Sequence, residues 1–261
     1  MNLDFIKYDL MTMPKLASEH GADVDKMVIY VHALMFFLFV GWAAYFLLAL
    51  FKFRKSNNPK ADYVGVKGHF STYLEVAVAG VEAVLLIGFA IPLWAKVVDE
   101  KPKVEQATNI RITAQQFQWN ARYAGPDHKF CRQDVKLVSK ENPFGLDMSD
   151  PNGKDDFIPA VNDFAVPVNK PVLIDVTSLD VIHSFKLPPL RVCQDAIPGL
   201  RIPVHFMPTK VGRYQITCAQ LCGNAHYGMR GYFTVMKQED YDKWAAEKAK
   251  ASAGGAPASF E

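Results

Sequence analysis

The sequence has few cysteines and almost no net charge, and each deficit excludes a class of function. Four cysteines in 261 residues are too few for a disulfide-stapled scaffold. The 29 basic and 27 acidic side chains leave a formal net charge of +2, so nucleic acid is not expected as a partner. Internal repeats, a glycine-rich phosphate loop and a Cys-x-x-Cys-His haem-attachment motif are also missing. The chain therefore carries no covalently attached haem of the c type.

Apolar residues are plentiful but concentrated near the N-terminus. Residues 27–51 and 73–97 form two runs, each long enough to cross a ~30 Å hydrocarbon core. Lys52-Phe53-Arg54-Lys55 follows the first run in place of a small-residue cleavage site, which favours a membrane helix over a secretory signal. The basic loop 52–72 is predicted to be cytoplasmic by the positive-inside rule. Residues 1–26 and everything after the second run are then extracytoplasmic.

Two carboxylates interrupt the second run. Glu75 lies at its cytoplasmic end, whereas Glu82 lies about 10 Å deeper and nearly on the same helix face. An ionisable group at that depth usually faces protein or water and often marks a proton path. Either such a path or a protonated carboxyl bonded to a neighbouring helix would explain Glu82. Both alternatives predict a partner membrane subunit.

The remainder, residues 98–238, has the composition of a folded β domain. Short alternating segments separated by turn residues predict an antiparallel sandwich or barrel. Residues 123–159 are rich in Gly, Pro, Asp and Asn and are expected to form loops. Residues 239–261 are expected to form a helix, strongest over 240–250, and a tail. The expected strands cover residues 109–119, 163–167, 171–177, 201–206, 212–218 and 231–236.

One stretch concentrates metal-binding chemistry. It contains Cys218, Cys222, His226 and Met229 close together in the sequence, and these side chains are ligands for a soft transition metal. Copper is the first metal to test, because zinc sites seldom use a thioether. The alternative is a helix that buries these residues on one face. The strand-like residues before Cys218 and the two glycines inside the stretch argue against that helix.

A further imidazole is needed to complete such a site. His183 follows an expected strand and can reach the motif, because strand ends position ligands rigidly. His205 is the competitor, but it lies inside an expected strand. The remaining histidines lack a neighbouring cysteine and are expected to be structural: His20, His32, His69 and His128.

Three blocks of sequence together resemble subunit II of the haem-copper cytochrome c oxidases. They are His183-Ser184-Phe185, Asp195-Ala196-Ile197-Pro198-Gly199 and the stretch from Cys218 to Met229. The resemblance covers nearly the whole chain and implies a two-helix transmembrane hairpin followed by an all-β, cupredoxin-like Greek-key sandwich. It also implies a binuclear copper centre, CuA.

The resemblance assigns a role to each ligand of that centre. Cys218 and Cys222 would bridge two copper ions, and His183 and His226 would each bind one. Met229 would be a weaker ligand, and the main-chain carbonyl of Gln220 would complete the set. Family members often carry a glutamate at position 220, whose side chain helps to bind magnesium at the boundary with subunit I. A neutral amide is a weaker ligand for that ion, so the magnesium site is expected to be weakened or lost.

The implied function is that of a respiratory oxidase subunit in a bacterial plasma membrane, surrounded by lipid and by further oxidase subunits. Electrons would come from a c-type cytochrome and pass to the haems of subunit I, where dioxygen is reduced to water and protons are pumped. The alternatives are a CuA protein of another respiratory reductase and a membrane-tethered copper carrier. A quinol oxidase subunit would lack the copper ligands, which are all present.

The resemblance also bears on an aromatic pair, two glutamates and the two remaining cysteines. The tryptophan that accepts the electron in the family aligns with Phe117, which leaves Trp119 as an aromatic of the sandwich, and electron uptake is assigned to this pair. Glu75 matches a glutamate at the mouth of a proton pathway, whereas Glu82 has no counterpart. Cys193 replaces a frequent lysine; it and Cys131 are either free thiols or a disulfide.

Overall fold

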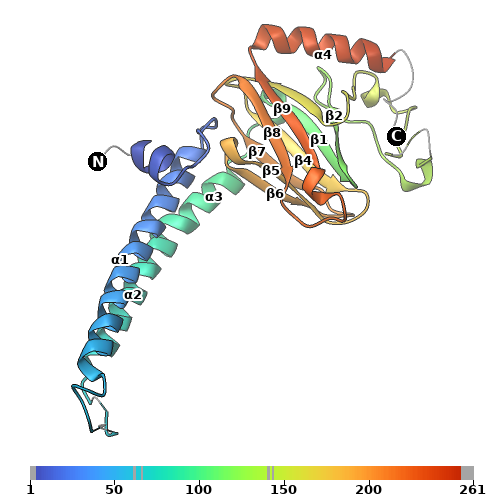
Figure 1. The fold of residues 1–261 in the computed structure, drawn as a ribbon. Coiled ribbons are helices and arrows are strands. Elements are labelled where there is room, and N and C mark those ends of the chain that lie inside the picture. Colours follow the sequence, from blue (N-terminus) through green and yellow to red (C-terminus); the bar gives the residue numbers. More distant parts are fainter. Residues whose placement is uncertain (1–3, 61–62, 66, 140–141, 143, 254–261) are drawn as a thin grey trace. The chain divides into compact units, whose positions relative to one another are not determined.

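The computed structural model describes residues 4–60, 63–65, 67–139, 142 and 144–253. It divides into two compact units. One contains Asp23–Lys96, and the other combines the preceding residues, up to Ala22, with those from Val97 onward. The first unit is helical and the second is built around β-strands (Figure 1).

The helical unit is a hairpin of two long apolar helices. The first is α1, Gly21–Phe53. The second consists of α2, Phe70–Leu85, a π-helical turn, Leu86–Ala90, and α3, Ile91–Asp99. Both are long and apolar enough to cross a membrane, and none of their apolar windows is buried within the described chain. They extend beyond the predicted runs because polar residues can continue a helix past the hydrocarbon. Glu75 and Glu82 are both exposed on α2.

The second unit is a sandwich of two sheets. One sheet has the strand order β2-β1-β4-β7 and the other β3-β9-β8-β5-β6. Inward-facing side chains of both sheets form the core, of which the largest fully buried members include Trp119, Phe164, Phe185 and Phe233. The strands are β1 Thr108–Gln115, β2 Gln118–Tyr123, β3 Asp163–Pro167, β4 Val172–Ser178, β5 His183–Leu187, β6 Val192–Ala196, β7 Ile202–Phe206, β8 Gly212–Cys218 and β9 Arg230–Met236.

The expected strands need three corrections. Residues 109–119 do not form one strand: β1 and β2 are an antiparallel hairpin that turns at Gln116 and Phe117, so Trp119 lies on the second arm. The sheets are not purely antiparallel, because the β1–β4 and β3–β9 pairs are parallel. In each of these pairs a long connection through the opposite sheet brings the second strand back in the same direction. Finally, β5 and β6 were missed, since prolines and a short helical turn interrupt their pattern.

Two terminal segments pack onto the sandwich. The Ala17 main-chain N–H donates to the Pro189 carbonyl at 2.8 Å, and the Ala17 carbonyl accepts from the Thr209 N–H at 2.8 Å. These bonds fasten residues before α1 to the β unit. At the other end, α4, Gln238–Ala253, places Trp244 against Tyr123 with ring centroids 5.4 Å apart. This helix is longer than the predicted span 240–250, and the tail from 254 lies outside the described residues.

Candidate metal centre

The centre is assembled at the ends of two paired strands. His183 is the first residue of β5 and Cys218 is the last of β8, and the two strands pair antiparallel through Phe185 and Cys218. The chain then loops through Cys222 and a short 3-10 turn to Met229, just before β9. The Cys218 N–H donates to the Met229 carbonyl at 3.3 Å, so the loop closes on itself. Strand pairing therefore brings together ligands that are far apart in sequence.

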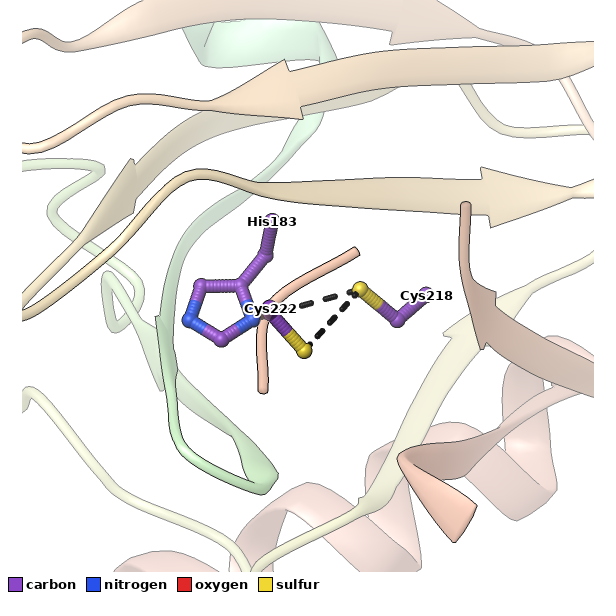
Figure 2. Close-up of side chains that lie close together, drawn as sticks. All are labelled: His183, Cys218 and Cys222. Atoms are coloured by element: carbon purple, nitrogen blue, oxygen red, sulfur yellow. Dashed lines mark hydrogen bonds between the residues drawn. The ribbon is translucent and has the colours of Figure 1, made fainter. Parts of the chain in front are cut away.

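All six predicted ligand groups lie close together where this loop meets the start of β5. Figure 2 shows three of them: the Cys218 and Cys222 Sγ atoms are 3.8 Å apart, and His183 Nδ1 is 3.9 Å from Cys218 Sγ. His226 Nδ1 lies 3.5 Å from Cys222 Sγ. Met229 Sδ is 3.7 Å from Cys222 Sγ and 3.2 Å from His183 Nδ1. The main-chain carbonyl oxygen of Gln220 lies 3.2 Å from Cys218 Sγ.

Burial controls the chemistry of these donors. His183, Cys222 and Met229 are buried, whereas Cys218 and His226 are partly accessible. Burial, together with the neighbouring Cys218 thiol, raises the pKa of Cys222 to about 11. The thiol is therefore protonated at neutral pH in the absence of a cation, and a bound metal must displace its proton. Two thiols, two imidazoles and a thioether in contact form a soft donor set that fits copper.

Asp180 orients the His183 imidazole. His183 Nε2 lies 2.8 Å from Asp180 Oδ1, which leaves Nδ1 facing the sulfur atoms. Burial by itself raises the pKa of Asp180, but hydrogen bonds from His183 and from the Gln116 and Val181 N–H groups outweigh it and lower the pKa. The Asp180 carboxylate thus accepts a hydrogen bond from His183 Nε2–H and fixes the tautomer of the imidazole. Sequence patterns alone do not assign Asp180 to the centre; its position three residues before the predicted ligand His183 is the available signal.

The hairpin turn between β1 and β2 supports the ligand loop from the other side. Gln116 Nε2 donates to the Cys222 carbonyl oxygen at 2.6 Å. Gly223 has φ +138°, and a Cβ there would lie 2.7 Å from Gln116 Nε2 and 3.1 Å from the Phe117 ring. Trp119 is fully buried, with its ring centroid 6.2 Å from that of His183. Phe117 therefore touches the ligand loop, and Trp119 is an aromatic of the sandwich, as predicted.

Other candidates lie elsewhere. His205 is on β7, in the sheet that does not carry the ligands. All four cysteines are free: Cys131 is buried and Cys193 is exposed on β6, so the alternative of a disulfide between them is not observed. Glu75 and Glu82 belong to the helical unit.

Comparisons with known proteins decide the family. Residues 110–234 match the family model described as cytochrome c oxidase subunit II, periplasmic domain. The alternative cytochrome c oxidase subunit 2 of Bradyrhizobium diazoefficiens is 33% identical over 219 residues, which cover 84% of this chain and 77% of the relative. The chain belongs to the cytochrome c oxidase subunit II family. The subunit 2 of Cyanidium caldarium is 28% identical over 225 residues, with 83% of each chain covered.

A solved structure is also similar, the periplasmic domain of subunit II of cytochrome oxidase from Bradyrhizobium japonicum. It is 30% identical, with a TM-score of 0.42, and the match covers 58% of this chain and 98% of that domain.

Family membership confirms the expected fold class, two apolar helices followed by a cupredoxin-like β domain. It makes the chain a subunit of a haem-copper oxidase, an oxidoreductase complex, and its two apolar helices fit a membrane subunit. The family domain implies CuA, and His183, Cys218 and Cys222 form a potential metal site whose ligand atoms lie within 4.8 Å of one another.

Proposed function

We propose that this chain accepts electrons from a c-type cytochrome and delivers them to the haems of subunit I, where dioxygen is reduced to water and protons are pumped. The observation that carries the proposal is the convergence of six donor groups from β5, β8 and the following loop. Cys218, Cys222, His183, His226, Met229 and the Gln220 carbonyl would hold the two copper ions of CuA. Bound in this way, CuA supplies a one-electron carrier in which the charge is shared between two metals.

The protein's own contribution is rigidity. His183 is held by Asp180 on one side and by the β5 strand on the other. The loop that carries Cys222 is held by Gln116 and closed by the main-chain hydrogen bond from the Cys218 N–H to the Met229 carbonyl. Ligands fixed in this manner need little rearrangement when the charge of the centre changes, which favours fast electron transfer.

Phe117 and Trp119 are proposed to carry the electron inward. Phe117 packs against the backbone of the ligand loop at Gly223, and Trp119 lies edge-on to the His183 ring at 65°. Because Trp119 is fully buried, direct contact with a donor protein falls to Phe117.

The helical unit is proposed to bind subunit I in a bacterial inner membrane, with the β unit on the periplasmic side. Its unburied apolar surface needs lipid or neighbouring helices. Glu75 and Glu82 would then serve proton uptake. The Gln220 side chain is exposed and neutral, so a magnesium ion at the subunit boundary would need its ligands from elsewhere.

Oxygen consumption by the purified complex tests this function. The parental complex should oxidise reduced cytochrome c with uptake of oxygen, and Cys222→Ser should abolish that activity while the haem subunit remains in the complex. A chain that purifies with copper but without a haem subunit would instead support a copper carrier.

A further inference from the structure

A second polar site lies on the outer face of the sheet β2-β1-β4-β7. Arg111 on β1 stands opposite Arg122 on β2 and Asp175 on β4. The next outward position is polar on all three strands, with Thr113 opposite Asn120 and Thr177. Outward positions of a sandwich usually face water. Here the chain between β2 and β3 covers them and leaves a hollow that opens to solvent.

The covering segment makes specific contacts with the arginines. The Phe130 ring lies beneath both guanidinium groups, with its centroid 4.2 Å from Arg111 Cζ and 5.1 Å from Arg122 Cζ. Gln133 Oε1 accepts from Arg201 Nη2 at 2.6 Å and from Arg111 Nη1 at 3.5 Å. The hollow therefore has a floor formed by the sheet and a wall formed by the loop.

Positive charge around the hollow exceeds negative charge. Arg111 Nε lies 3.6 Å from Asp175 Oδ2, and Arg122 Nη1 lies 3.4 Å from Asp156 Oδ2. Arg201 is the third guanidinium of the lining, and it donates to the neutral amide of Gln133. Burial, followed by the charges of Arg122 and Arg201, lowers the pKa of Arg111 to about 10. A bound anion would reduce the electrostatic repulsion among these three guanidinium groups.

Buried groups of the same hollow also lack hydrogen bonds. Arg122 is only 5% exposed, and its Nη2 has no hydrogen-bond partner among the described residues. The Asn120 Oδ1 acceptor likewise has none in that part of the chain. Buried polar atoms are normally satisfied, so an unpaired donor and an unpaired acceptor on two residues that line one hollow point to a ligand.

We propose that the hollow binds inorganic phosphate in its monohydrogen form. The guanidinium groups suit a tetrahedral oxyanion, which can accept several charge-assisted bonds at once. The Asn120 carbonyl needs a donor, and the Asp175 carboxylate, which lines the same hollow, can accept one more. Hydrogen phosphate has one O–H group to offer, whereas sulfate has none at neutral pH. The bound ion would link the loop at Gln133 to the sheet, and its binding would stabilise the β unit by mass action.

Calorimetric titration of the full chain in detergent with phosphate and with sulfate, at matched ionic strength, tests the proposal. Phosphate should bind saturably at one site, and sulfate should bind about tenfold more weakly or worse. Arg201→Gln, which changes an exposed residue, should weaken phosphate binding by about tenfold or more. The matched control is Arg213→Gln, which removes an exposed arginine from β8, in the other sheet and not among the lining residues, and should leave the affinity unchanged.

A third variant tests the selectivity. Asp175→Asn should bring sulfate affinity up to that of phosphate, because it removes the repelling carboxylate. Phosphate should also raise the thermal midpoint of the parent more than that of Arg201→Gln. Absence of saturable phosphate binding by the parent would overturn the proposal, as would equal weakening by Arg201→Gln and Arg213→Gln. Equal binding of sulfate by the parent would overturn the assignment to hydrogen phosphate. These readouts do not depend on the copper site.

Discussion

Gly223 follows Cys222, a proposed copper ligand. Its substitution tests how closely the hairpin turn between β1 and β2 packs against the ligand loop. Its φ of +138° is a conformation that other residues rarely adopt, and a Cβ would meet Gln116 Nε2 at 2.7 Å. In Gly223→Ala the backbone strain costs about 1–3 kcal/mol. The hydrogen bond from Gln116 to the Cys222 carbonyl would be displaced, which costs about 1 kcal/mol more. The free energy of unfolding should therefore fall by about 2–4 kcal/mol.

Thermal unfolding of the full chain in detergent, followed by near-ultraviolet circular dichroism, measures this effect. For a unit of this size the midpoint should fall by about 4 to 16 °C. Gly228→Ala is the matched control, because it lies in the same loop and a Cβ there would have no heavy atom within 4 Å. The control should change the unfolding free energy by less than about 0.5 kcal/mol. Equal midpoints for the two variants would refute the close approach between the hairpin turn and the ligand loop.

Three further predictions concern Asp180, Asp147 and Glu75. Asp180→Asn should weaken copper binding by about 10 to 100-fold in competition with a chelator, since the ligand imidazole loses its carboxylate acceptor; unchanged affinity would contradict the orienting role. Hydrogen bonds from Ser149 and then Arg132 lower the pKa of Asp147 to about 2, below its ordinary 3.8, so stability from this group is present above pH 4 and is lost as the pH falls towards 2. The stability of Asp147→Asn should accordingly change less with pH over that range than the stability of the parent. An unchanged pH profile would contradict the lowered pKa of Asp147. Glu75→Ala should slow oxygen consumption by the complex, and turnover at the parental rate would sink the proton-uptake proposal.

Much of the centre could be predicted because its ligands sit in a compact motif. The spacing from Cys218 to Met229, with glycines between, excluded a helix and indicated a loop after a strand. His183 was found from its place near a strand end, although it begins β5 and does not merely follow β4.

Features that depend on tertiary contact were not visible in the sequence. Continuous alternation through Gln116 and Phe117 concealed the hairpin turn, because the pattern of side chains alone does not show a reversal of direction. The orienting bond of Asp180 depends on a turn whose shape is set by surrounding main-chain donors. The segment at Ala17 binds to the sandwich through main-chain hydrogen bonds, which any residue can make, so the sequence does not predict this contact.

The outward arginines illustrate the same limit. Alternation along β1 and β2 places Arg111 and Arg122 on the outer face, where solvent exposure would be the ordinary expectation. Only the path of the chain between β2 and β3 shows that Phe130 and Gln133 cover them.

Copper content, measured together with the electron paramagnetic resonance spectrum of the full chain, tests the central claim most directly. A binuclear centre should give two copper ions per chain and a hyperfine pattern from one unpaired electron shared by two equivalent copper nuclei. Cys222→Ser should lose that pattern. One copper per chain with the spectrum of an isolated ion would contradict the binuclear centre.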